Sequence, residues 1–260
     1  MKLFYICLKF LTMHSEVLSE LEIRRYSQQI ELPSVGLAGQ EKIKQSKVLV
    51  VGAGGKGTAL MQYLVAAGIG KIGISDNNLV EERVLPNQTL YGNGDLGKQK
   101  AIISKQKLTK INHLTKIELH NVCLSETNIT PICNDYDIIV DATDNLPAHY
   151  LINDAAVRLN KPVVYGSVHR SQAFISVFNY NNGPSFRSMY AQIPKGKEML
   201  SLDRIVSAGI ITGIAGTIMA NEVLKIILDM PYTLSGELLV FDASDYVMKR
   251  KQIRKVPDNF

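Results

Sequence analysis

Tryptophan is absent from the sequence, and cysteine occurs at only three positions, Cys7, Cys123 and Cys133. No two of these cysteines form a CxxC pair, so the sequence offers neither a disulfide framework nor a thiolate zinc site. So few thiols are typical of a reducing compartment, and we expect a cytoplasmic protein. Cys123 and Cys133 fall in or beside segments predicted to form the core, which predicts buried structural thiols.

The excess of positive over negative charge is also small. Lys and Arg number 29 against 24 Asp and Glu, a net charge of +5. The lysines recur without a dense run, which is typical of solvated helical surfaces, although an attraction for phosphates or an acidic partner is the alternative. We expect neither nucleic acid nor a membrane as a partner.

The N-terminal segment contains no hydrophobic run long enough to cross a membrane. The apolar stretch Met1–Thr12 is interrupted by Lys2 and Lys9, is too short to span a bilayer and is followed by no small-residue cleavage site. Because Met13 follows it, we expect residues 1–14 to be a disordered leader or a misassigned start. The remaining residues, 15–260, are predicted to form one domain, since the chain is 46% hydrophobic and can fill a large core.

Short apolar strands alternate with helices along most of the chain. The predicted strands of this part are Lys47–Val51, Lys71–Ser75, Lys116–Val122, Asp137–Val140 and Pro162–Tyr165. The predicted helices are Ser15–Glu22, Gly36–Gln45, 56–68, Leu96–Ile111 and 147–159. This alternation predicts an α/β fold with a Rossmann-like, mostly parallel sheet and helices on both faces.

The pattern changes after residue 170. A strand of different character is predicted at Ala173–Asn179, followed by a long apolar helix at Ile210–Ile227 and a last strand at Glu237–Phe241. We expect these elements to extend the sheet in an antiparallel arrangement. The long helix is predicted to lie in the core, with a contribution to a subunit interface as the alternative.

A glycine-rich turn follows the first strand. The sequence Gly52-Ala-Gly54-Gly55-Lys-Gly57 stands between that strand and a helix, so its glycines permit a tight turn, a close approach of the backbone to phosphates and close packing of helix on strand. Asp76 ends the next strand, where it can accept a hydrogen bond from a ribose 2′-OH. The pattern predicts nucleotide binding and leaves ATP and NAD open; a tight turn that binds nothing is the structural alternative.

Several further blocks, in the right order, resemble the ThiF/MoeB/HesA family, the bacterial relatives of ubiquitin-activating enzymes. The resemblance covers residues 25–246 and rests on Arg25-Tyr-Ser27, Gly36-Leu-Ala-Gly-Gln40, the glycine turn, Asp95-Leu-Gly-Lys-Gln-Lys100, Val140-Asp-Ala-Thr-Asp-Asn145, Tyr165-Gly-Ser-Val168, Gly183-Pro184 and Leu234-Ser-Gly236.

The resemblance implies a nucleotidyltransferase that uses ATP and Mg²⁺. It implies transfer of AMP to the C-terminal Gly-Gly carboxylate of a ubiquitin-like sulfur carrier protein, in thiamine, molybdopterin or related sulfur transfer, and it implies a homodimer. By resemblance Asp76 holds the ribose, Lys100 contacts the phosphates and Asp144 holds Mg²⁺. Asn87 and Gln88 would complete the nucleotide site with the glycine turn. A solvated lysine and a helix-capping aspartate are the alternatives for Lys100 and Asp144.

The chain departs from the family pattern where two phosphate-binding arginines are expected, because Gln28 and Asn87 stand at those positions. One of these arginines is expected to come from the neighbouring subunit. Gln and Asn donate hydrogen bonds but carry no charge, which puts activity in doubt. Arg24 lies four residues before Gln28, and Arg83 lies four residues before Asn87. Arg83 is a candidate catalytic residue that could replace the arginine expected at Asn87.

Two serines, Ser185 and Ser188, stand where the family pattern has zinc-binding cysteines, so zinc is not expected. His169-Arg170 follows a strand and predicts either a surface turn or a contact with the carrier tail. The favoured function is adenylation. The alternatives are a degenerate relative that binds nucleotide or carrier with little or no adenylation, and an NAD(P)-dependent oxidoreductase, against which the Asp141–Asn145 block argues.

Overall fold

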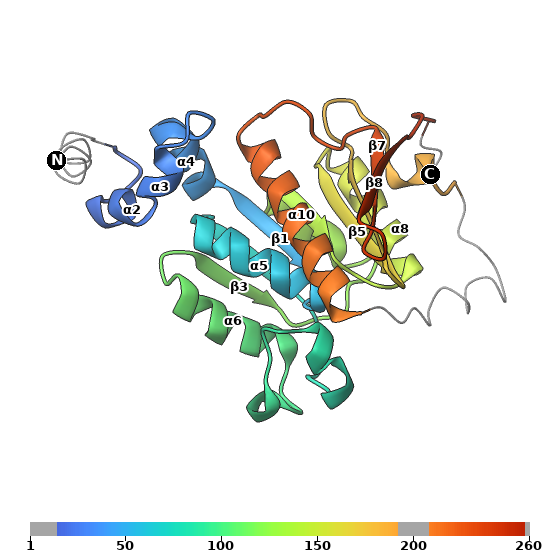
Figure 1. The fold of residues 1–260 in the computed structure, drawn as a ribbon, viewed down its shortest axis with the longest axis horizontal. Coiled ribbons are helices and arrows are strands. Elements are labelled where there is room, and N and C mark those ends of the chain that lie inside the picture. The colour runs from blue at the N-terminus through green and yellow to red at the C-terminus, as the bar shows by residue number, and fades with distance from the viewer. Residues whose placement is uncertain (1–14, 192–207, 258–260) are drawn as a thin grey trace.

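The computed structural model describes residues 15–191 and 208–257, which form one eight-stranded sheet with the order β3-β2-β1-β4-β5-β6-β7-β8 (Figure 1). The strands are β1 (Lys47–Val51), β2 (Lys71–Ser75), β3 (Lys116–His120), β4 (Ile138–Asp141), β5 (Val163–His169), β6 (Gln172–Phe178), β7 (Glu237–Asp242) and β8 (Val247–Gln252). The α-helices are α2 (Glu20–Arg25), α3 (Ser27–Ile30), α4 (Gly36–Gln45), α5 (Gly55–Ala67), α6 (Lys100–Ile111), α7 (Ile129–Asn134), α8 (Leu146–Arg158) and α10 (Gly209–Ile227). The 3₁₀ helices are η1 (Glu82–Asn87), η2 (Asn93–Asp95) and η3 (Phe186–Ser188).

Five strands, β3-β2-β1-β4-β5, run parallel. The chain starts in the middle of the sheet at β1, moves outward to β2 and β3, and then returns to the other side of β1 for β4 and β5. The direction of winding therefore reverses between β1 and β4, and ligands of open α/β sheets bind beyond the carboxyl ends of the strands at such a point. The predicted parallel sheet is confirmed.

Alternate residues of the buried strands face opposite sides of the sheet, so each side has its own apolar cluster. Val48 and Val50 of β1 belong to the cluster that contains buried residues of α5, α6 and α10. Leu49 and Val51 belong to a second cluster with residues of α7 and α8. Helices therefore cover both faces, as predicted; α5 and α10 lie on the face turned towards the viewer in Figure 1.

The antiparallel extension consists of β6, β7 and β8. The β5–β6 hairpin turns at Arg170, whose φ is +55°, and His169 pairs with Gln172 across it. His169 and Arg170 are exposed, as expected for a surface turn. Strand β8 was not predicted, since every residue of Val247–Gln252 is exposed and no apolar alternation marks it.

Two predicted helix starts are wrong. The helix expected at Ser15–Glu22 begins at Glu20, because Ser19 caps it and Glu22 returns a hydrogen bond to the Ser19 backbone. The helix expected from Leu96 begins at Lys100, because Gly97 takes a φ of +74° and interrupts the chain after η2. The leader expected at 1–14 lies outside the described residues.

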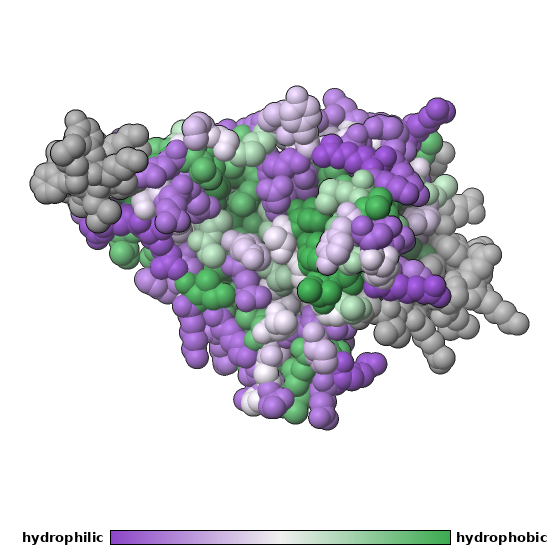
Figure 2. Space-filling model, viewed as in Figure 1, coloured by the Kyte–Doolittle hydropathy of each residue, from purple (hydrophilic) through white to green (hydrophobic). Residues whose placement is uncertain are grey.

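Helix α10 confirms the expected core burial on one face. It packs on α5, β5 and β6, with Ile211, Ala215 and Met219 fully buried. By length and composition it could cross a membrane, but 56% of its apolar window is buried inside the protein, as in core helices of soluble folds. The opposite face stays apolar and outside, and Figure 2 shows hydrophobic surface over α10.

Candidate functional site

The glycine-rich turn lies at the reversal point of the sheet. Gly52 follows β1 with a φ of +98°, and a side chain there would meet the Ala142 carbonyl at the end of β4. Its N–H donates to the carbonyl of Ser75 at the end of β2, at 2.9 Å. Gly54 then caps α5, whose first N–H groups have no partner within the helix and form, with the helix dipole, a site suited to anions.

Two other glycines explain the tightness of this turn. A side chain on Gly57 would collide with the Gly52 carbonyl, so the third glycine lets α5 approach the strand, as predicted. A side chain on Gly55 would meet Thr212 of α10 and the carbonyl of Asn87. The start of α10 and the end of η1 therefore close one side of the turn.

Asp76 stands directly after β2 and is 8% exposed. Its Oδ2 accepts the Ala53 N–H at 2.7 Å, and its Oδ1 accepts the backbone and side-chain N–H groups of Asn78 at 2.8 and 3.0 Å. The carboxylate thus holds the glycine turn in place and keeps unused acceptor capacity on Oδ2. Its contact with a ribose stays a prediction.

Gln88 is brought to the turn from the end of η1 and is 7% exposed. Its amide nitrogen Nε2 lies 3.8 Å from the position that a Cβ on Gly54 would take. Its Oε1 is buried, and no group of the described residues forms a hydrogen bond with it. An unpartnered buried amide oxygen carries a desolvation cost, so a ligand group that donates a hydrogen bond above Gly54 would satisfy it.

Lys100 begins α6 and is 8% exposed. Its backbone N–H donates to the carbonyl of Asn78 at 2.9 Å, which fixes it beside the loop after β2. Across the described residues, its ammonium group has no hydrogen-bond or ion-pair partner. The pKa of Glu81 is lowered mainly by the hydrogen bond from Arg83, with a smaller contribution from the charge of Lys100. A nearly buried cation without a carboxylate partner is available to a phosphate.

Asp144 lies in the loop between β4 and α8, and 78% of its side chain is exposed. Its Oδ2 lies 3.9 Å from the Cβ position on Gly54, a position that Gln88 also approaches. Its Oδ1 accepts a hydrogen bond from Lys56, a residue that the sequence reasoning missed. The signal that could have found Lys56 is a charged residue inside the glycine turn, at a position where the following helix is buried.

Magnesium is tested by the donors around Asp144. In the described ranges no group of three or more His, Cys, Asp or Glu side chains could hold a metal ion. Mg²⁺ commonly binds through one or two carboxylates, with water and substrate phosphates as the other ligands. The exposed Asp144 carboxylate fits that arrangement, so the ion would be held by Asp144 together with the nucleotide.

The loop that carries Asp144 is held by Asp141, which is 2% exposed. Its carboxylate accepts hydrogen bonds from Thr143 N at 3.1 Å, from Thr143 Oγ1 at 2.7 Å and from His149 Nδ1 at 2.7 Å. Burial alone would raise the pKa of Asp141, but the charge and hydrogen bond of His149 and the bonds of Thr143 outweigh it, and the pKa is lowered.

The sequence profile of the ThiF family matches residues 26–259. The chain belongs to the ThiF family. Among its relatives, the sulfur carrier protein adenylyltransferase of Thermus thermophilus is 37% identical over 241 residues, which cover 91% of this chain and 89% of the relative. The probable molybdopterin-synthase adenylyltransferase of Porphyra purpurea is 41% identical over 225 residues, covering 85% of this chain and 58% of the relative. The chain spans 63% of another, the probable adenylyltransferase/sulfurtransferase MoeZ of Mycobacterium tuberculosis, at 37% identity over 94% of this chain.

Solved structures share the fold of this ThiF-family chain. PaaA superposes with a TM-score of 0.79 at 24% identity, covering 94% of this chain and 77% of PaaA. Escherichia coli MccB with ATP superposes with a TM-score of 0.78 at 23% identity, covering 98% of this chain and 80% of MccB.

The two positions at which the resemblance leads us to expect arginines, Asn87 and Gln28, lie far apart. Asn87 is beside the glycine turn, where its carbonyl accepts from Thr212 Oγ1 at 3.3 Å. Gln28 is exposed on α3, whose neighbouring Gln29 donates to the carbonyl of Ala67 at the other end of α5. Because a 13-residue helix such as α5 is about 20 Å long, Gln28 does not reach the turn of its own chain.

Arg83 does not point into the site in this structure. Its side chain is 82% exposed, and its Nε donates to Glu81 at 2.5 Å. The other candidate replacement, Arg24, pairs with Glu20 at 3.8 Å on α2. The catalytic role of Arg83 stays a prediction.

The segment that contains Ser185 and Ser188, where the resemblance leads us to expect cysteines, is built around an aromatic cluster. Ser185 is buried, and the oxygen of Ser188 accepts the N–H of Val256 at 3.2 Å. Between them, Phe186 packs against His149, Tyr150, Tyr165, Phe178 and Tyr190. The expectation about zinc stays a prediction. One thiol differs from expectation: Cys133 is buried, but Cys123 is exposed after β3, because the chain there has left the sheet.

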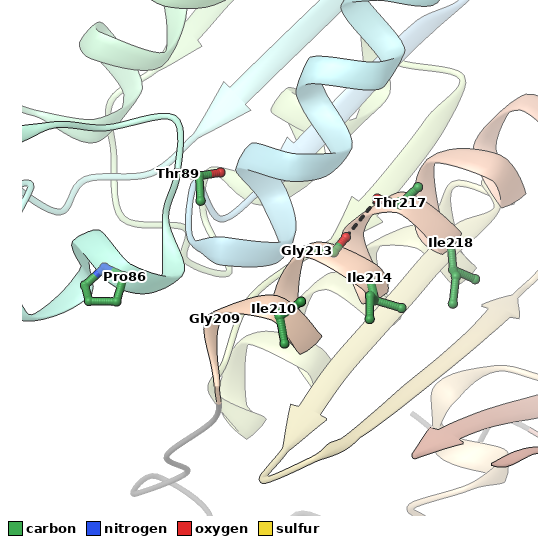
Figure 3. A pocket seen from close by; sticks show the side chains of 8 residues that line it. All are labelled: Pro86, Thr89, Gly209, Ile210, Gly213, Ile214, Thr217 and Ile218. Carbon is green, nitrogen blue, oxygen red and sulfur yellow. Dashed lines mark hydrogen bonds between the residues drawn. The ribbon is translucent and has the colours of Figure 1, made fainter. Parts of the chain in front are cut away.

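A shallow apolar groove of about 570 Å³ lies next to η1, lined by Pro86, Thr89 and the outer face of α10 (Figure 3). Ile210, Ile214 and Ile218 stand on the same side of α10 there. None of the described residues that line the groove is titratable, so they offer contact surface rather than chemistry.

Proposed function

We propose that this protein uses ATP to adenylate the C-terminal Gly-Gly carboxylate of a ubiquitin-like sulfur carrier protein. The observation that carries the proposal is the convergence on Gly54 of a helix N-terminus, the orphaned Gln88 amide and the exposed Asp144 carboxylate. Membership of the ThiF family and the 37% identity to the Thermus adenylyltransferase over most of both chains support the same activity.

The residues divide the work on the nucleotide. Asp76 accepts a hydrogen bond from the ribose, while the first N–H groups of α5, the Nε2 amide group of Gln88 and the ammonium group of Lys100 bind phosphate oxygens. A magnesium ion at Asp144 would neutralise charge that builds on the phosphates. The carrier carboxylate oxygen forms a bond to the α-phosphorus as the bond from that phosphorus to the bridging oxygen breaks, and pyrophosphate leaves. The protein supplies positioning and charge, and no side-chain nucleophile is needed.

The partner is inferred from chemistry and from the relatives' names. Adenylation needs an accessible carboxylate on a flexible tail. A Gly-Gly terminus can enter a narrow site because glycine has no side chain. The Thermus relative is named for a sulfur carrier protein and the Porphyra relative for molybdopterin synthase. We place the protein among the adenylyltransferases that prepare such carriers for sulfur transfer in the cytoplasm.

We also propose that it works as a homodimer. The outer face of α10 presents Ile210, which is 73% exposed, and the groove beside it. The remoteness of Gln28 from its own glycine turn supports a second copy, because only a neighbouring subunit could bring that position to a site. Light scattering tests this proposal: Ile214→Asp should convert the dimer to a monomer, and a monomeric wild type would contradict it.

The experiment that tests the function is ATP–pyrophosphate exchange with Mg²⁺ and a candidate carrier ending in Gly-Gly. Exchange should require the intact carrier and should vanish when its last two glycines are removed. Lys100→Ala should lower the exchange rate by about two to three orders of magnitude, as for loss of an oxyanion donor. The matched control is Lys98→Ala, because Lys98 is exposed and its Nζ donates to the Gly94 carbonyl within its own loop. Equal rates in both variants would contradict the role of Lys100.

A second candidate function is nucleotide or carrier binding with little or no turnover. The replaced arginines and the outward position of Arg83 favour it, since they reduce the positive charge around a triphosphate. The same assay distinguishes the two functions, because ATP binding without carrier-dependent exchange supports the second.

A further inference from the structure

Lys56 is the second residue of α5 and lies inside the glycine-rich turn. Its side chain is 2% exposed, so its charge is almost completely removed from water. Its Nζ donates to the Thr143 carbonyl at 3.1 Å and to Asp144 Oδ1. These two partners offset the cost of removing the Lys56 charge from water.

The ion pair is asymmetric. Lys56 is enclosed, whereas 78% of the Asp144 side chain is exposed and its second oxygen faces the space above Gly54. An exposed carboxylate can exchange partners at little cost, but the buried lysine cannot leave the site. The cation is therefore the permanent member of the pair, and the carboxylate is the member that a ligand can draw away.

Lys56 also supplies positive charge near the glycine turn, where the expected arginines are absent. The family pattern places arginines where this chain has Gln28 and Asn87, and Arg83 points away from the turn. Lys56 is a cation on the first turn of the phosphate-binding helix. Because its ammonium group bonds the carboxylate that flanks Gly54, it stands next to the space that phosphates would fill.

We propose that Lys56 is a resident cation of the nucleotide site, which occupies Asp144 in the nucleotide-free protein and binds a phosphate oxygen when ATP enters. The proposal rests on the proposed ATP-dependent function. Two consequences follow. ATP should bind measurably without a divalent cation, because a positive charge is already present. Lys56 and Mg²⁺ should compete for Asp144, so removal of Lys56 should increase the dependence of ATP binding on Mg²⁺.

Isothermal titration calorimetry of the full chain with ATP and with adenosine, each in Mg²⁺ and in EDTA, tests the proposal. Lys56→Met removes the charge and keeps the length of the side chain. Replacing a buried charge by an apolar group of similar volume is commonly tolerated, and a melting curve checks that the variant is folded. Asp144→Asn removes the carboxylate and leaves Lys56 in place.

Lys71→Met is the matched control. Lys71 is also mostly buried, with 16% of its side chain exposed, and also pairs with a more exposed carboxylate, Glu118. It begins β2 and pairs with Lys47, so it lies at the amino ends of the parallel strands, whereas the glycine turn follows the carboxyl end of β1. The control therefore removes the same charge from a comparable ion pair outside the site.

In EDTA, Lys56→Met should weaken ATP binding by about tenfold or more, as expected for a hydrogen bond to a charged group, and leave adenosine binding unchanged. Mg²⁺ should recover most of that loss. Asp144→Asn should bind ATP in EDTA at least as well as the wild type and should gain little from Mg²⁺.

Three results would overturn the proposal. One is equal ATP affinity of Lys56→Met and wild type in EDTA. Another is parallel loss of ATP and adenosine binding in Lys56→Met and Asp144→Asn, which would make the ion pair a structural brace. A wild type that binds no ATP even with Mg²⁺ would reject the proposed function as well, which separates that failure from the first two.

Discussion

The carboxylate of Asp141 accepts a hydrogen bond from His149 Nδ1 at 2.7 Å, and both side chains are buried. The pair lies directly beneath the loop that presents Asp144 to the glycine turn. It is the clearest case in this chain of a buried polar contact that shapes the site without facing it.

Asp141→Asn should therefore destabilise the fold by about 1–3 kcal/mol at neutral pH, the cost of depriving the buried Thr143 and His149 groups of their carboxylate acceptor. Because the pKa of Asp141 is held below its usual value of 3.8, its contribution is fully present above that pH and is lost as the pH falls through the lower, folded-state pKa. Urea unfolding from pH 7 to pH 3 checks this, and the wild type should approach the variant at the acid end. Asp135→Asn, at an exposed position, should change stability by less than about 0.5 kcal/mol. A difference in unfolding free energy between the wild type and Asp141→Asn that stays the same at every pH would contradict the lowered pKa of Asp141.

Asp76→Asn should reduce the discrimination between ATP and 2′-deoxy-ATP. The amide also presents N–H groups to the donors of Ala53 and Asn78, so about 1–3 kcal/mol of stability should be lost. Calorimetry with both nucleotides and thermal melting measure the two effects. Asn77→Ala, at an exposed neighbouring position, serves as the control. An unchanged preference for ATP in Asp76→Asn would show that the ribose is held elsewhere.

Gly54→Ala should separate binding from folding. The new methyl group would lie 3.8 Å from Gln88 Nε2 and 3.9 Å from Asp144 Oδ2, which are ordinary contacts, and the extended backbone there suits alanine. The fold should persist, while ATP affinity should fall by at least about tenfold because the methyl group occupies the approach to the helix N-terminus. Gly57→Ala should instead lose about 1–3 kcal/mol of stability, since its methyl group meets the Gly52 carbonyl. Normal ATP affinity in Gly54→Ala would exclude this approach for the phosphates.

The cysteines should differ in reactivity. Burial raises the pKa of Cys133 to about 12, so its thiolate is scarce at neutral pH and also shielded. Cys123 is exposed. Iodoacetamide at pH 8 should modify Cys123 in the native protein and Cys133 only after unfolding, as read by mass spectrometry of the peptides. Rapid native labelling of Cys133 would mean that α7 opens readily.

Local patterns predicted the centre of the fold well. The bounds of β1 and β2 follow from short β-branched runs closed by Gly52 and Asp76, and the glycine spacing located the turn. Strand β8 escaped because its sequence has no buried face; pairing with β7 defines it instead. The start of α6 escaped because the left-handed conformation of Gly97 depends on the loop around it.

Only the part of the site that lies in local sequence motifs was predicted. Asp76, Lys100 and Asp144 stand in motifs, whereas the Lys56–Asp144 pair joins residues 88 positions apart and depends on the packing of α5 beside the β4–α8 loop. The distance between Gln28 and the turn likewise follows from the length of α5 in three dimensions. Contacts between distant segments carry no local signal, so the sequence named most of the candidate residues but not their partners.

The solvent-facing borders of the sheet limit how copies of this chain can associate. One border is β8, where Lys249, Arg250 and Lys251 are exposed, and the other is β3, which begins at the exposed Lys116. Bringing two copies of β8 together would align like charges along the backbone, which opposes strand-by-strand growth into fibrils at that border. Self-association of this molecule is thereby directed away from its strands and towards its helical surfaces.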